Sequence, residues 1–165
     1  MPIALIFLSH LVLGYVAWLL VFGVYILPRF RTMSRFDVQR AIATLHSFRF
    51  FGLVFILPGV VGAHLPQSFA TVAAWGDFAT GILALLALLT ARVRPLFWLF
   101  IVAYTVTGVA DLVVDYINAV QAGLPEQAGR LGAAYVIPII YVPLLMITHM
   151  AALYWLIRPQ PAAHP

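Results

Sequence analysis

Five long apolar runs divide the chain and constrain its fold more than any other feature. They cover residues 2–27, 42–63, 69–90, 96–116 and 131–157. A helix needs about 20 apolar residues to cross a hydrocarbon layer about 30 Å thick, and each run meets that length. Only 8% of the residues are charged, whereas soluble domains average about 25%. The pattern excludes an ordinary soluble protein and predicts an all-α, polytopic membrane bundle of five transmembrane helices.

The five runs form one domain without an internal repeat. We expect residues 1–158 to make a single transmembrane domain, and the Pro-rich segment 159–165 to be a disordered tail. The first run carries no charge before Arg29, unlike the basic start of a cleaved signal peptide, so it is predicted to be a retained helix.

The arginines predict the orientation of the bundle. With five spans, one side of the membrane holds seven of them: Arg29, Arg31, Arg35, Arg40, Arg92, Arg94 and Arg158. The opposite side holds only Arg130. Because cytoplasmic connections carry the excess of basic residues, the N-terminus is predicted outside and the C-terminus in the cytoplasm.

Missing residue types exclude several kinds of chemistry. The chain has neither Cys nor Lys, so disulfides, thiolate metal sites, lysine Schiff bases and a P-loop are excluded. The net charge is +4, but most of the arginines lie in short connections between apolar runs. We therefore expect the lipid bilayer, and no nucleic acid, as the partner of this charge.

Polar residues inside the outer half of the bundle form the candidate site. By helix rise, His10, Asp77 and Asp111 lie roughly 10, 12 and 8 Å below the outer surface. A carboxylate inside a span costs about 2.5 to 3.5 kcal/mol, which makes it a candidate functional residue. The predicted ligand-binding set is Asp77, Asp111, His10, Trp75, Tyr104, Asp115 and His64.

Two expectations concern the carboxylates of this set. Asp77 and Asp111 are predicted to face each other at the polar end of a largely apolar cavity and to hold one proton between them. Asp115 lies near a helix end, where it either joins the pocket or pairs with Arg130.

The inner half carries a second polar group made of His46, Arg49 and His149. Arg49 is counted only about 6 Å from the inner boundary, so it is predicted to extend to water as an interfacial anchor. Asp77 then lies too far away for a direct ion pair. The histidines also permit a haem b interpretation, because bundles bind haem between facing His residues. The level pairs are His10 with His64, and His46 with His149.

Small residues on the third run predict a close helix contact. Gly76, Thr80 and Ala84 repeat at four-residue spacing, which makes a smooth ridge for another helix. The ridge is a candidate surface for a homo-oligomer or a membrane-protein partner.

The stretch from Leu65 to Ala70, followed by Trp75-Gly76-Asp77, resembles an LPxxFA…WGD pattern of small bacterial multi-pass inner-membrane proteins. The resemblance covers about a third of the chain. It implies a location in the bacterial inner membrane and supplies no reaction. The chain is also similar in size and span number to the translocator-protein family, but it lacks that family's Trp- and Pro-rich signatures.

Three classes of function follow. The first is binding or handling of a small lipophilic or cationic molecule in an outward-facing polar pocket. The second is a membrane b-type haem or quinone-linked electron-transfer subunit. The third is a noncatalytic partner or assembly subunit of a membrane complex. The sequence does not decide whether the protein is an enzyme, and no spacing specifies a metal.

Overall fold

The computed structural model describes residues 1–158, and these residues are helical throughout apart from short connections. The all-α prediction is confirmed. Four helical stretches are long and apolar enough to cross a membrane: Ile3–Thr32, Gln67–Leu89, Arg94–Gln121 and Ile137–Ile157. The predicted tail 159–165 lies outside the described residues.

The first stretch is a single long rod. Helix α1 (Ile3–Val21) passes through a π-helical turn, η1 (Phe22–Ile26), into α2 (Leu27–Thr32). Pro28 lies in the first turn of α2, where a missing N–H is tolerated. The helix therefore continues past Leu27, the predicted end of the first span, and finishes beyond Arg31.

The second predicted span, residues 42–63, is not one continuous helix. Helix α3 (Arg35–His46) begins seven residues before Ile42, and the Ser34 side chain accepts a hydrogen bond from the Asp37 N–H at its start. A 3-10 helix, η2 (Ser47–Ile56), follows directly. Residues 57–66 are non-helical. The run is therefore interrupted well before Ala63, the predicted end.

Helices α4 (Gln67–Leu89) and α5 (Arg94–Gln121) form an antiparallel hairpin. Pro95 lies in the first turn of α5. The helix continues five residues past Tyr116, its predicted end, and Gly123 follows with a φ of 59°. A glycine with positive φ just after the last turn is the common way to end a helix.

The last predicted span, residues 131–157, begins with two irregular helices. They are the 3-10 stretch η3 (Pro125–Tyr135), which is kinked where Gly132 has a φ of 54°, and the π-helical turn η4 (Ile137–Tyr141), followed by α6 (Val142–Ile157). Pro138 and Pro143 lie in the first turns of η4 and α6. Because a proline has no N–H, regular α-helical bonding is interrupted there.

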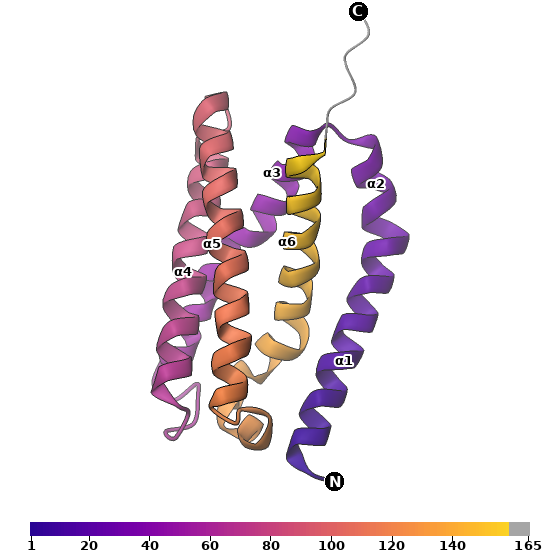
Figure 1. Ribbon diagram of the computed structural model, residues 1–165. Coiled ribbons are helices and arrows are strands. Elements are labelled where there is room, and N and C mark those ends of the chain that lie inside the picture. Colours follow the sequence, from indigo (N-terminus) through magenta and orange to yellow (C-terminus); the bar gives the residue numbers. More distant parts are fainter. Residues whose placement is uncertain (159–165) are drawn as a thin grey trace, which may run out of the picture.

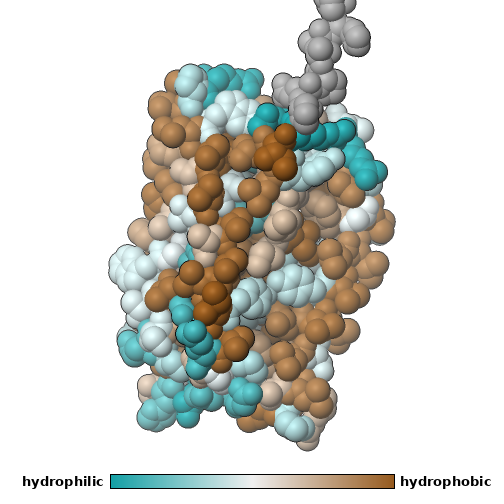
Figure 2. Space-filling view, viewed as in Figure 1, coloured by the Kyte–Doolittle hydropathy of each residue, from teal (hydrophilic) through white to brown (hydrophobic). Residues whose placement is uncertain are grey.

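Figure 1 shows how these elements are arranged. Helices α4 and α5 lie on one side, α1 and α2 on the other, and α6 between them. Residue 1 and the last turn of α6 are at opposite ends of the bundle. Figure 2 shows a broad hydrophobic belt, with hydrophilic side chains gathered toward the two ends. This distribution is compatible with a membrane protein.

Candidate functional site

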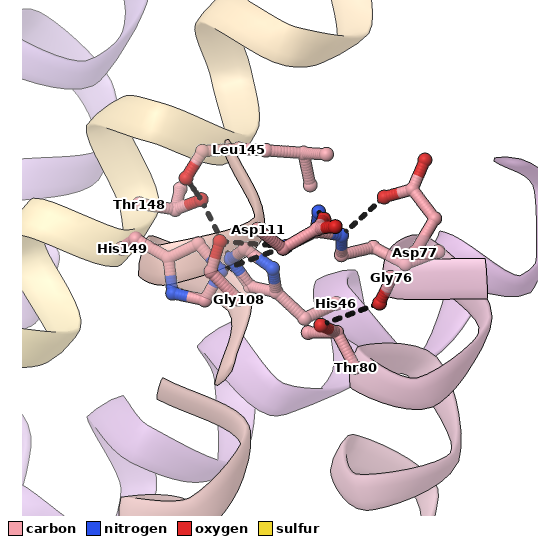
Figure 3. Close-up of polar contacts among 10 residues, drawn as sticks. His46, Gly76, Asp77, Thr80, Gly108, Asp111, Leu145, Thr148 and His149 are labelled. Carbon is pink, nitrogen blue, oxygen red and sulfur yellow. Dashed lines mark hydrogen bonds and ion pairs between the residues drawn. The ribbon is translucent and has the colours of Figure 1, made fainter. Parts of the chain in front are cut away.

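The centre of the bundle holds a buried arginine. Arg49, on η2, is 0% exposed. Its Nε donates to Oδ1 of Asp77 on α4 at 2.6 Å, and Nη2 donates to Oδ2 of Asp111 on α5. Figure 3 shows the two carboxylates reaching the same point from different helices. These are the only ion pairs within residues 1–158.

The remaining edge of the guanidinium contacts α5 and α6. Nη1 donates to the Gly108 carbonyl at 3.3 Å and lies 3.1 Å from Nε2 of His149. A guanidinium can only donate, so Nε2 of His149 accepts and the ring proton lies on Nδ1. His149 is therefore neutral in this arrangement. One arginine thus ties η2 to α4, α5 and α6.

His46, at the end of α3, extends the cluster toward α6. Its Nε2 lies 3.0 Å from the Thr148 hydroxyl, which itself donates to the Leu144 carbonyl at 2.7 Å. Since a hydroxyl has one proton, Thr148 accepts from His46 here. The rings of His46 and His149 lie 3.9 Å apart between centroids. Their Nδ1 atoms are buried without a partner in the described chain.

Three glycines make room for these charges. A Cβ on Gly52 would overlap the Asp77 carboxylate, and one on Gly76 would overlap the Asp111 carboxylate. A Cβ on Gly108 would lie 2.8 Å from Nη1 of Arg49 and would overlap the His149 ring. The cluster therefore depends on close approach of three helical segments, which only residues without a side chain allow.

The structure corrects the prediction for Arg49. Interfacial anchoring is wrong because the side chain is fully buried, and the predicted separation from Asp77 is wrong because the two residues are hydrogen-bonded. The error arises because the helix that precedes Arg49 starts earlier in the chain than predicted. Helix α3 begins at Arg35 rather than at Ile42, which moves Arg49 about 10 Å deeper at 1.5 Å per residue.

Asp77 and Asp111 approach each other through Arg49 rather than through a shared proton. The guanidinium donates to both carboxylates, so an opposite charge is already present between them. The premise of the shared-proton hypothesis, two carboxylates without a cation, does not hold. Charge-assisted hydrogen bonds of this kind fix carboxylates in position.

Asp115 lies one helical turn beyond Asp111 and has no such partner. Its Oδ1 atom is buried and makes no hydrogen bond within the described chain. Arg130, one of its two predicted alternatives, bonds instead to the Gln127 side chain and, at 3.1 Å, to the His64 carbonyl. The structure therefore does not support the Asp115–Arg130 pair.

A mostly apolar cavity of about 110 Å³ adjoins the buried cluster. Asp77 and Asp115 are its only charged lining residues. Its apolar walls come from α1, η2, α4, α5, η3, η4 and α6, and include Phe7, Leu11, Phe55, Phe69, Leu112 and Pro138. Two further lining residues, Leu8 and Val120, are 46% and 72% exposed. The cavity therefore reaches the surface between α1 and α5.

The other predicted ligand-binding residues lie apart from this cavity lining. Tyr104 is buried beside His46 and His149, with ring centroids 5.7 and 5.9 Å away. Nδ1 of His10 lies 2.9 Å from the Tyr135 hydroxyl. Trp75 is 54% exposed and packs against Phe78. His64 is exposed in the non-helical segment 57–66.

The structure does not support the predicted haem site between His46 and His149. His46 and His149 are in ring contact, and their Nε2 atoms already bond to Thr148 and Arg49, so no space remains for a porphyrin between them. His10 bonds to Tyr135, whereas His64 lies in a separate connection. Within residues 1–158 no three His, Asp or Glu side chains gather to hold a metal ion.

The small-residue ridge of α4 is used inside the chain. Thr80 and Ala84 are fully buried, and Gly76 faces the Asp111 carboxylate. A partner protein would have to bind another surface.

The comparisons with known proteins add a family. No curated protein and no solved structure matches the chain significantly. A family model described as a domain of unknown function (DUF8737) matches residues 6–157. Because this match covers almost the whole chain, the protein belongs to the DUF8737 family.

Proposed function

We propose that the protein crosses the membrane five times, with its N-terminus outside and its C-terminus in the cytoplasm. Four crossings correspond to the long apolar helices. The path of α3 and η2 supplies the fifth, since their combined rise is about 38 Å. The seven arginines outside the bundle core support this orientation. The LPxxFA…WGD resemblance supports a bacterial inner membrane as the location.

We further propose that the cavity beside Asp115 binds a small apolar molecule that carries a protonated amine. The observation that carries this proposal is the buried Oδ1 atom of Asp115, which lines the cavity and has no hydrogen-bond partner in the described chain. A buried carboxylate oxygen without a hydrogen-bond partner is costly. A ligand ammonium group would supply the missing donor and the missing charge.

The local charges favour a cation. Three carboxylates, Asp77, Asp111 and Asp115, lie within about one helical turn of the cluster, and Arg49 supplies one positive charge. His149 accepts from Arg49 and is neutral. Carboxylates therefore outnumber cations in this part of the bundle. A cationic ligand reduces that imbalance, whereas an anionic ligand increases it.

The Arg49 cluster gives the cavity a rigid floor. Asp77 lines the cavity while its Oδ1 atom is held by Arg49. Asp115 is on the same helix as Asp111, which Arg49 also holds. The Asp115 carboxylate, which would bind the ligand, is therefore preorganised, and this reduces the entropy lost on binding.

The size of the cavity limits the ligand. An engineered cavity of about 150 Å³ holds benzene, so a cavity of about 110 Å³ that is open at one side limits the ligand to one small ring, with its remaining atoms in the opening. Because the opening lies between α1 and α5, such a molecule would enter from the lipid. The proposed ligand class is thus a one-ring or short-chain alkyl amine.

Binding of benzylamine to the purified protein tests this proposal. Calorimetry should show weak, saturable binding, and Asp115→Asn should reduce the affinity at least about tenfold, the loss of about 1.4 kcal/mol. Asp115→Asn should not lower the thermal stability of the ligand-free protein, because Oδ1 of Asp115 has no hydrogen-bond partner to lose within the described chain.

Two controls separate the carboxylate from general effects. Asp37→Asn removes an exposed carboxylate that bonds to Ser34 and should leave benzylamine affinity unchanged. Benzyl alcohol has the same ring without the charge and should bind more weakly than benzylamine. Equal binding of both probes, or equal effects of the two Asn variants, would contradict an amine site at Asp115.

A further inference from the structure

A second hollow lies between the α1–α2 rod and α6, on a different part of the molecule from the Asp115 cavity. Its volume is about 550 Å³. The apolar lining includes Leu19, Phe22, Leu27, Met146, Met150 and Trp155. The only charged residues in the lining are Arg31 and Arg158. We call this hollow the α1–α6 groove.

We propose that the α1–α6 groove binds one anionic phospholipid, with the phosphate at Arg31 and Arg158 and an acyl chain along α6. This inference rests on the proposed membrane orientation and is independent of the amine site. The groove and the cavity share no lining residue, so each can fail without the other.

The state of the two arginines supports an anionic headgroup. Within residues 1–158, neither guanidinium has an ion-pair partner. That of Arg158 lies over the Tyr154 ring, 5.7 Å from its centroid, which holds it at the edge of the groove. By contrast, the guanidinium of Arg35 donates to the Leu156 carbonyl and lies 4.9 Å from the Trp98 ring centroid. At this end of the groove, Arg31 and Arg158 are therefore the arginines available to bind a phosphate.

The arginines lie at one end of the groove, as a lipid requires. Arg31 is in the last turn of α2, and Arg158 follows α6 directly. Both belong to the end of the bundle that we assign to the cytoplasmic surface. Basic residues next to a span attract anionic lipids of that leaflet. The phosphate of the headgroup would thus meet two positive charges at the level of the cytoplasmic surface.

The length of the groove matches one leaflet. Met146 and Arg158 both line it, and twelve residues of helix separate them, about 18 Å. Half of a hydrocarbon core about 30 Å thick is about 15 Å. An acyl chain anchored at the arginines therefore reaches the middle of the bilayer inside the groove. Two methionines in the wall suit this occupant, because their side chains adapt to irregular apolar shapes.

Native mass spectrometry of the full chain in a neutral detergent tests the proposal. Phosphatidylglycerol and phosphatidylcholine with identical acyl chains are titrated separately. The wild type should retain one phosphatidylglycerol more tightly than phosphatidylcholine. Arg31→Gln with Arg158→Gln should weaken phosphatidylglycerol binding at least tenfold and leave phosphatidylcholine binding unchanged.

Matched variants separate the groove from diffuse charge. Arg29→Gln with Arg92→Gln removes the same charge from arginines that do not line the groove and should retain the preference. Met150→Trp should weaken phosphatidylglycerol binding by filling the groove. Leu99→Trp, at an exposed site on α5, should not.

Three results would overturn the proposal. The first is equal binding of the two lipids by the wild type. The second is an equal loss of phosphatidylglycerol affinity in the two double arginine variants. The third is a stable dimer that Met150→Trp dissociates, which would identify a second copy of the chain as the occupant.

Discussion

Arg49 is surrounded on every side, whereas α1 meets the rest of the chain along one side only. In the most apolar windows of α4 and α5, 39% of residues are buried inside the structure, against 6% for the window in the α1–α2 rod. The core side joins η2, α4, α5 and α6 through charged hydrogen bonds. The α1 side relies on apolar contact and a few neutral hydrogen bonds.

These neutral hydrogen bonds are spread along α1. His10 bonds to the Tyr135 hydroxyl, Tyr15 to the Tyr116 hydroxyl at 2.6 Å, and the Trp18 indole donates to the Ile140 carbonyl at 2.8 Å. Each neutral bond contributes about 0.5 to 1.5 kcal/mol. The α1 rod is therefore the part of the bundle that separates at the lowest cost.

Both proposed ligand sites use α1 as a wall. Phe7, Leu8 and Leu11 line the Asp115 cavity, and Tyr15 and Leu19 line the α1–α6 groove. The charged core fixes the position of Asp77 and Asp111, whereas the weakly attached α1 helix closes one side of each hollow. Outward movement of α1 would then widen the openings of both hollows.

The largest expected effect comes from removing the central cation. Arg49→Met leaves Asp77 and Asp111 buried without a partner, and breaking a buried pair in this way costs about 3 to 5 kcal/mol. We expect a large loss of monodisperse protein in detergent and a lower melting temperature, measured by size-exclusion chromatography during heating. Arg40→Met, at an exposed arginine of α3, is the matched control.

A rescue distinguishes charge from packing. Adding Asp77→Asn and Asp111→Asn to Arg49→Met removes the two unpaired charges, so much of the lost stability should return. No difference between Arg49→Met and Arg40→Met would mean that the ion pairs do not hold the core.

The sequence predicts the long apolar helices and the carboxylates inside them, but it does not predict the cavity between them. The apolar runs of α4 and α5 predicted their positions to within a few residues, because lipid-length helices need no tertiary information. Asp77 and Asp111 stood out for the same reason, since carboxylates are rare inside spans. The cavity required the packing of seven helical elements, which the periodicity of the sequence does not encode.

Arg49 could have been found from the sequence. Ser34 and Asp37 have the spacing of a helix start, and the structure confirms a hydrogen bond from the Asp37 N–H to Ser34. That signal places the helix start at Arg35 and Arg49 near the middle of the bundle. The apolar run alone begins later, at Ile42, because the first turns of α3 carry Arg35, Asp37 and Arg40. The 3-10 geometry of η2 had no comparable signal.

A smaller effect is expected from filling the space around the charges. Gly108→Ala would place a methyl group against Arg49 and His149, and overpacking of this kind costs about 1 to 3 kcal/mol. Gly23→Ala, in η1, meets nothing within 4 Å. There the change should stabilise the helix by about 0.5 to 1 kcal/mol. Melting temperatures should therefore shift in opposite directions, and a similar loss in both variants would contradict the contrast between core and periphery.

The smallest effect should be local to α1. Trp18→Phe keeps an aromatic ring but removes the N–H that donates to the Ile140 carbonyl, so about 1 kcal/mol of attachment is lost. Because α1 is held separately from the charged core, the loss should appear as faster amide hydrogen exchange in the α1 segment, with α4 and α5 unchanged. Trp75→Phe is the control, since that side chain is exposed on α4. If Trp18→Phe instead accelerated exchange equally in α1, α4 and α5, the bundle would open as one unit, and α1 would not be the wall that admits ligands.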